Sequence, residues 1–195
     1  MDTKHHLIIC HLKKRKRAQA VHYDVIIVGS GVAGLTAAIA LPTTLKVLVL
    51  NKSYPWECNT YYAQGGVTTA YDNEDIPLHV KDTLEAGAGM CDEAAVVKMS
   101  QDSQAAIRRL IERGFSFDKD DDGQLLYTKE AAHSRNRILH AGGDATGRHL
   151  HFFLLQNNPH PMLGDATVID LLIHNNRCYG VEILSEGKQH HVYAN

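Results

Sequence analysis

The apolar and polar residues near the start of the chain predict two strands and a helix between them. Residues 23–28 are nearly all apolar and rich in β-branched side chains, and a glycine-containing turn follows them. Residues 33–41 are small and apolar and end before Pro42, and a second apolar run covers residues 46–50. Short runs of this kind are typical of strands buried on both faces of a parallel sheet. The order strand, turn, helix, strand predicts a βαβ unit.

Helical spacing of apolar residues appears further along the chain. Residues 76–86 predict a short helix, and residues 146–156 predict another. Between them, Asp92 is a suitable N-cap for a longer helix that runs to Arg113, with Gly114 at its C-terminal end. We expect its apolar stripe to face the core, formed by Val96, Met99, Ile107, Leu110 and Ile111.

The remaining segments predict loops, a hairpin and an antiparallel meander. Residues 51–66 lack periodicity and predict a loop that wraps around a ligand. Residues 115–118 and 125–127 predict the arms of a hairpin around an acidic turn. From Ala166 onward, three alternating segments are separated by turn residues near positions 175–176 and 186–187, which predicts a meander.

Composition narrows the class of protein. The 195 residues are 44% hydrophobic and carry a formal net charge of −2, which argues against disorder and against general nucleic-acid binding. No apolar run approaches the ~20 residues of a membrane span. The cysteines are widely spaced, which favours reduced thiols in a cytoplasmic protein over a disulfide framework or a zinc site. They are Cys10, Cys58, Cys91 and Cys178.

The first 22 residues differ from the rest of the chain in their charge pattern. Residues 13–17 form a basic cluster that follows a short apolar stretch, the reverse of the order in a signal peptide. A nuclear-localisation or nucleic-acid-binding role is the alternative to a solvated arm. We expect residues 1–22 to form a poorly ordered basic arm and residues 23–195 to form the domain.

The turn after the first strand matches the GxGxxG pattern of dinucleotide-binding proteins. In that pattern the glycines permit a tight turn, close approach of a pyrophosphate and packing of helix on strand. The turn consists of Gly29, Ser30, Gly31, Val32, Ala33 and Gly34. The acidic residue expected after the second strand is replaced by Asn51 and Lys52, so the pattern alone leaves NAD, NADP and FAD open.

Residues 51–53 and 59–66 resemble the second flavin-binding segment of the flavoprotein superfamily that contains succinate dehydrogenase, fumarate reductase and aspartate oxidase. Respiratory members carry the flavin covalently on a histidine of this loop, and here that position holds Asn59. The resemblance therefore implies non-covalent FAD and favours the aspartate oxidase branch. Besides the glycine turn, the implied cofactor-binding residues are Asn51, Lys52, Ser53, Asn59, Thr60, Tyr61, Tyr62, Ala63, Gln64, Gly65, Gly66 and Val168.

Further blocks resemble the same branch, namely residues 79–84, 86–92, 128–134, 137–140 and 144–148. The fold class implied is α/β: a Rossmann-like FAD/NAD(P)-binding domain with a parallel sheet, flanking helices and an antiparallel β-meander, incomplete at the C-terminus. The resemblance further implies oxidation of L-aspartate to iminoaspartate, with O2 or fumarate as electron acceptor, as the first step of NAD synthesis. It also implies a functional link to quinolinate synthase and no nucleic-acid partner.

The candidate catalytic residues also rest on the resemblance. Glu130 matches a family glutamate that could meet the substrate ammonium, and His133 and Arg137 would lie near flavin and substrate. Without the family, His133 and His140 would be ordinary partly buried histidines, and the acidic turn at 118–123 a solvated loop rather than a calcium site. We expect no metal.

Two alternatives to an aspartate oxidase stay open: a soluble fumarate reductase or succinate dehydrogenase flavoprotein, and a non-catalytic flavin-binding remnant. The family's capping region and C-terminal helical domain have no counterpart in the 195 residues. Because chemistry needs reacting groups held at short range, we expect this chain alone to be inactive or nearly so.

Overall fold

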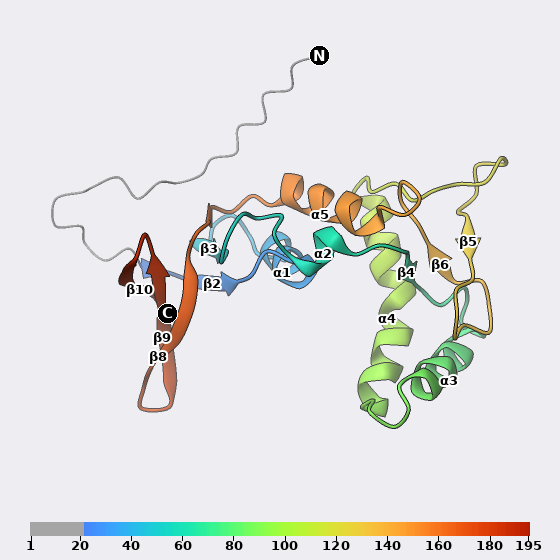
Figure 1. Cartoon of the computed structure of the whole chain (residues 1–195), viewed down its shortest axis with the longest axis horizontal. Coiled ribbons are helices and arrows are strands. Elements are labelled where there is room, and N and C mark those ends of the chain that lie inside the picture. Colours follow the sequence, from blue (N-terminus) through green and yellow to red (C-terminus); the bar gives the residue numbers. More distant parts are fainter. Residues whose placement is uncertain (1–21) are drawn as a thin grey trace, which may run out of the picture. The chain divides into compact units, whose positions relative to one another are not determined.

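The computed structural model describes residues 22–195 (Figure 1). The basic arm expected over residues 1–22 lies outside the described residues, except for His22, which begins strand β1 (His22–Tyr23). Residues 23–195, expected to form one domain, divide into two compact units. The first unit comprises the described residues up to 61 together with residues 151–195, and the second comprises residues 62–150.

A parallel sheet in the first unit contains the predicted βαβ unit. Strand β2 (Val25–Val28) leads through helix α1 (Val32–Ala40) to strand β3 (Val47–Leu50). The sheet order is β2-β3-β7, with both pairings parallel and β7 formed by Met162–Leu163. All four residues of the central strand β3 are buried, as expected, whereas β2 lies at the edge and is only partly buried.

The predicted meander is confirmed as the second sheet of this unit. Its strands are β8 (Thr167–His174), β9 (Arg177–Ser185) and β10 (Lys188–Ala194), all paired antiparallel, while β1 runs parallel to β10. The four residues of the two turns, 175–176 and 186–187, all have positive φ. Such turns match the twist of a two-stranded hairpin. The two sheets share one hydrophobic cluster, formed by Leu48, Leu50, Ala166, Val181 and Ile183.

The second unit contains two helices and a small antiparallel sheet (Figure 1). Helices α3 (Ile76–Ala86) and α4 (Glu93–Glu112) have the predicted bounds to within a residue. The sheet has the order β4-β6-β5, formed by Val67–Thr68, Ile138–Leu139 and Tyr127–Thr128. Each of its strands is two residues long, which explains why the residue pattern did not predict them.

The caps of α4 are as predicted, but fewer residues of the helix are buried than the predicted apolar stripe contains. Asp92 accepts a hydrogen bond from the Ala95 backbone N–H, and Gly114 has φ +97°. The prediction that the apolar stripe faces the core is wrong for Met99 and Ile111, which are 50% and 40% exposed. The helix instead buries Val96, Ser100 and Ile107.

The loop expected over residues 51–66 contains a short helix, α2 (Asn59–Tyr62). The predicted hairpin after α4 is reduced to a single bridge between Lys119 and Leu125. Helix α5 (Thr146–Asn157) carries residues of both units. Within residues 22–195 we find no helix with the length and apolar character needed to span a membrane.

Candidate cofactor-binding and active-site residues

The glycine turn of the first unit has the geometry that its sequence predicts. Gly29 has φ +99°, a conformation that favours glycine. A Cβ atom added to Gly34 would lie 2.0 Å from the Gly29 carbonyl oxygen, so only glycine lets α1 pack this closely on the turn. Gly31 stands at the N-cap of α1 without a side-chain cap. The Val32 N–H donates to Thr60 Oγ1 at 3.0 Å, which ties the predicted loop to the first turn of the helix.

Asn51, at the end of β3, occupies the position where dinucleotide-binding proteins often carry an acid. Its side chain is buried, and its Nδ2 donates to Ser30 Oγ at 3.0 Å. Ser30 Oγ in turn donates to the Pro55 carbonyl at 2.8 Å. The Asn51 Oδ1 atom is buried and has no hydrogen-bond partner among residues 22–195. A buried acceptor of this kind fits a donor such as a ribose hydroxyl, so the residues present suit a bound nucleotide.

The other predicted cofactor residues of this unit lie in different environments. Lys52 and Asn59 are exposed, whereas Ser53 and Tyr61 are partly buried. Val168 packs against the hydrophobic cluster between the two sheets. Lys52 and Asn59 are thus accessible to a ligand, and the cofactor contact of Val168 stays a prediction.

In the second unit, Gly65 and Gly66 form a closely packed dipeptide. The Gly65 N–H donates to Asp144 Oδ1 at 3.0 Å, and its φ is +69°. A Cβ atom at Gly66 would lie 2.3 Å from Ile138 Cγ2, so no larger residue fits. Before this pair, Tyr62, Ala63 and Gln64 are exposed.

Glu130 lies against this dipeptide. Its Oε1 atom would be 3.4 Å from a Cβ atom at Gly65, and half of its side chain is exposed. His140 Nε2 lies 3.7 Å from the same carboxylate oxygen and 2.9 Å from Thr128 Oγ1. The sequence predicted Glu130 as a site residue but set no role for His140, which the fold places beside it.

Arg137 is wholly buried and already fully paired. Its Nη2 and Nε atoms donate to the two oxygens of Asp75, at 2.7 and 3.0 Å, and its Nη1 donates to Asp82. Burial by itself would raise the pKa of Asp75 and lower that of Arg137. The hydrogen bonds of the pair outweigh burial, so the pKa of Asp75 is lowered and that of Arg137 is raised.

Asp82 connects the buried Asp75–Arg137 pair to the loop that contains His133 and Ser134. Besides Arg137, its carboxylate accepts hydrogen bonds from the backbone N–H and the hydroxyl of Ser134, both at 2.7 Å. Burial by itself would raise the pKa of Asp82, but the hydrogen bonds from Arg137 and then from Ser134 outweigh it and lower the pKa. The sequence missed Asp75 and the partnership with Asp82, because both lie more than fifty positions from Arg137.

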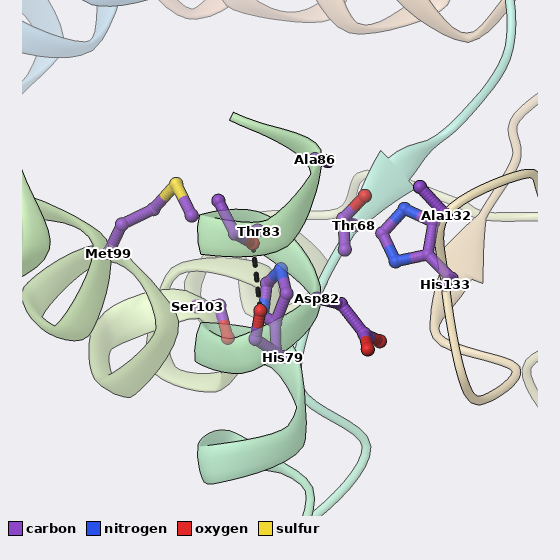
Figure 2. A pocket seen from close by; sticks show the side chains of 9 residues that line it. All are labelled: Thr68, His79, Asp82, Thr83, Ala86, Met99, Ser103, Ala132 and His133. Carbon is purple, nitrogen blue, oxygen red and sulfur yellow. Dashed lines mark hydrogen bonds between the residues drawn. The ribbon is translucent and has the colours of Figure 1, made fainter. Parts of the chain in front are cut away.

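His133 faces a cavity of about 330 Å³ between this loop and the helices. Figure 2 shows its lining, with His79, Asp82 and Thr83 from α3 and Met99 and Ser103 from α4. His79 is buried, and desolvation together with the positive charge of Arg137 lowers its pKa, which favours the neutral imidazole. Its Nδ1 atom lacks a partner among residues 22–195.

The three predicted catalytic residues therefore fall into two groups. His133 Nδ1 lies 3.3 Å from Arg137 Nη1, beside the cavity and the buried carboxylates. Glu130 points instead to Gly65 and His140 and does not line the cavity. In the described part of the chain, no group of three or more His, Cys, Asp or Glu side chains is arranged to hold a metal ion.

A strand–glycine turn–helix unit with a buried asparagine in place of the usual acid defines a dinucleotide-binding protein of the Rossmann-like class. A family model described as "FAD binding domain" matches residues 24–195. The chain belongs to this FAD-binding domain family, and the prediction of FAD as cofactor is thereby confirmed.

The predicted resemblance to aspartate oxidases is confirmed as well. The chain is 42% identical over 160 residues to an L-aspartate oxidase of Bacillus subtilis, which covers 80% of this chain and 30% of that protein. It is 48% identical over 130 residues to an L-aspartate oxidase of Streptomyces coelicolor, covering 66% of this chain and 22% of that one. The chain thus spans less than a third of these two relatives.

Solved structures share the fold. An E. coli quinol fumarate reductase chain matches with a TM-score of 0.81 and 27% identity, covering 91% of this chain and 32% of that one. A Mycobacterium smegmatis Sdh1 complex matches with a TM-score of 0.81 and 22% identity, covering 91% of this chain and 34% of that one. The predicted α/β class with a parallel sheet and an antiparallel meander is confirmed.

Proposed function

We propose that this chain is the FAD-binding portion of an enzyme that oxidises L-aspartate to iminoaspartate, with O2 or fumarate as acceptor, in the first step of NAD synthesis. The observation that carries the proposal is the 42–48% identity to L-aspartate oxidases over most of the chain. On this proposal the protein acts in the cytoplasm on a dicarboxylate, and quinolinate synthase consumes its product. The chain alone is expected to turn over little or no substrate.

The cofactor is proposed to bind without a covalent link. Asn59 has no nucleophilic atom to attach a flavin, and it is exposed at the start of α2. In the first unit, the open N-terminus of α1 and the buried Oδ1 of Asn51 supply donors and an acceptor for the nucleotide. In the second unit, the resemblance implies that residues 63–66 contact the flavin ring. The bound isoalloxazine would accept a hydride from the substrate Cα.

Glu130 is the residue that we propose to meet the substrate ammonium. Half of its side chain is exposed, so its carboxylate is open to a ligand while one oxygen packs on Gly65. A carboxylate favours an amino acid over succinate, because succinate has no ammonium group to pair with it. This contact would give the site its preference for aspartate.

Arg137 and Asp82 are proposed to position the loop rather than to contact substrate. Both oxygens of Asp75 and one of Asp82 already engage the guanidinium of Arg137, which is fully buried. The guanidinium is therefore unavailable to a dicarboxylate in this arrangement. Its function would be to hold His133 and Ser134 beside α3.

An anaerobic reduction experiment tests the proposal. The 195-residue chain, loaded with FAD, is mixed with L-aspartate and, separately, with succinate while the visible flavin absorption is followed. Bleaching by aspartate alone supports the oxidase and shows that the chain itself is active. Bleaching by succinate alone overturns it in favour of the fumarate reductase alternative, whose fold this chain shares. Bound flavin that neither compound reduces identifies the chain as a cofactor-holding portion without activity of its own.

A further inference from the structure

The loop that follows β3 is held firmly beside the glycine turn. Pro55 is buried, and its carbonyl oxygen accepts hydrogen bonds from Ser30 Oγ, at 2.8 Å, and from the ring of His151. Further along the loop, Thr60 Oγ1 accepts from the first N–H of α1. The segment between Asn51 and Thr60 is thus anchored to the residues expected to bind the nucleotide.

This anchored loop presents a stacked pair of aromatic rings. Tyr54 and Trp56 flank Pro55, with ring centroids 5.1 Å apart and an angle of 5° between the ring planes. Tyr54 is 56% exposed, while Trp56 is partly buried. The partly buried Trp56 ring supports the exposed Tyr54 ring, which leaves tyrosine surface on which a further planar group can stack.

We infer that the Tyr54–Trp56 stack receives the adenine ring of FAD. In Rossmann-like proteins the residue that ends the second strand binds the ribose of the adenosine half, and here that residue is Asn51. The two aromatic residues lie three and five positions beyond it, on the loop that Ser30 and Val32 hold beside the glycine turn. Aromatic side chains stack on any purine through its π-face, without needing a hydrogen-bond code.

The inference deepens the proposed function, since it rests on FAD as the cofactor, but it can be tested with ADP, which carries the same adenosine half and no flavin. Trp56 is the single tryptophan of the chain, so tryptophan fluorescence reports on the stack alone. We expect ADP to quench the Trp56 emission of the 195-residue chain with saturation. The same dissociation constant should appear in titration calorimetry.

Variants at position 54 separate stacking from folding. Tyr54→Ala should weaken ADP binding by about 5- to 150-fold, the range typical of a lost base–aromatic stack. Tyr54→Phe keeps the ring and should bind within about twofold of the original chain. Tyr179→Ala removes an exposed tyrosine of the same unit that packs on Arg177, and it serves as the matched control with unchanged affinity.

The outcomes distinguish this inference from the proposed function. If FAD is retained but ADP leaves Trp56 emission unchanged, or if Tyr54→Ala binds ADP as tightly as the original chain, the stack does not hold adenine and the cofactor assignment stands. If neither FAD nor ADP binds, both the inference and the cofactor-holding role of this chain are overturned. A fall in ADP affinity in both Tyr54→Ala and Tyr54→Phe would also overturn it, because the ring would then not be the contact.

Discussion

At the scale of single residues, burial changes the role that we assign to Arg137. The sequence presents it as a charged member of a catalytic block, whereas the fold encloses it between two carboxylates. We predict that Arg137→Ala destabilises the chain by about 3–5 kcal/mol, because it leaves Asp75 and Asp82 buried without their partner. Urea unfolding measures this change.

Arg135 provides the matched control for that variant. Its guanidinium lies 3.9 Å from Asp72 on the surface, with 45% of its side chain exposed. Exposed pairs contribute little, so Arg135→Ala should change the free energy of unfolding by less than about 1 kcal/mol. If Arg137→Ala were equally mild and affected only flavin reduction, Arg137 would be a catalytic residue after all.

Ala132 has an unfavourable backbone conformation. Its φ is +67°, a region that costs residues with a Cβ atom about 1–2 kcal/mol. We predict that Ala132→Gly stabilises the folded chain by about 0.5–1 kcal/mol, the strain relieved exceeding the added entropy of the unfolded chain. The neighbouring Ala131→Gly should do the reverse, since Ala131 is not among the residues with positive φ. Equal effects of the two variants on the midpoint of thermal unfolding would refute this account.

At the scale of elements, α1 depends on the close approach that Gly34 permits. A methyl group there would overlap the carbonyl of Gly29 at 2.0 Å, and neither atom can move without shifting the helix. We predict that Gly34→Ala loses FAD retention by at least about tenfold and that the folded state is destabilised by more than about 1 kcal/mol. Flavin retained after gel filtration measures the first effect.

Ala37→Gly tests whether α1 is sensitive to any change. Ala37 is exposed in the same helix, and glycine there should cost about 1 kcal/mol of helix propensity with no loss of flavin. Retention of FAD in Gly34→Ala at the level of Ala37→Gly would show that the glycine turn does not hold the cofactor.

The elements with strong local signals were the ones that the sequence predicted. Continuous apolar runs identified β2 and β3, a cap and a terminal glycine bounded α4, and turn residues separated the strands of the meander. The sheet β4-β6-β5 has two-residue strands that only distant backbone pairing defines. The exposed Met99 and Ile111 also escaped prediction, because periodicity reveals which residues share a face but not how much of it is covered.

The candidate site was predictable to a lesser degree. Gly34 and Gly66 behave as their motifs require, since an added Cβ atom would clash at either position, and Gly29 has the positive φ that favours glycine. Glu130 and His133 were predicted from the resemblance to the family. In the fold, Glu130 lies against Gly65, whereas His133 lines the cavity. The Asp75–Arg137–Asp82 cluster depends on contacts between residues far apart in the sequence, which no local pattern encodes.

For the molecule as a whole, three hydrogen-bonded carboxylates, of which Asp75 is fully buried, predict sensitivity to acid. Hydrogen bonds lower the pKa of Asp75 and Asp82, and the backbone N–H groups of Gly143 and Gly142 lower that of Asp118. A lowered folded-state pKa contributes stability that is fully present above the unfolded value of about 4 and is lost as the pH falls toward the folded value. The free energy of unfolding should therefore decrease between about pH 5 and pH 2.

Urea unfolding at a series of pH values tests this prediction. Asp118→Asn removes one of the three carboxylates while it retains an acceptor for one glycine N–H, so its stability should depend less steeply on pH in this window. If the free energy of unfolding of Asp118→Asn depended on pH as that of the original chain does, Asp118 would not contribute to the acid sensitivity.

The central claim is that this chain holds FAD without a covalent bond, and flavin release tests it most directly. The 195-residue chain is mixed with FAD, freed of excess cofactor by gel filtration and then denatured. The account predicts about one flavin per chain before denaturation, with all of it recovered in solution as intact FAD afterwards. A chain that retains no flavin, or one whose flavin stays attached to the denatured polypeptide, would contradict it.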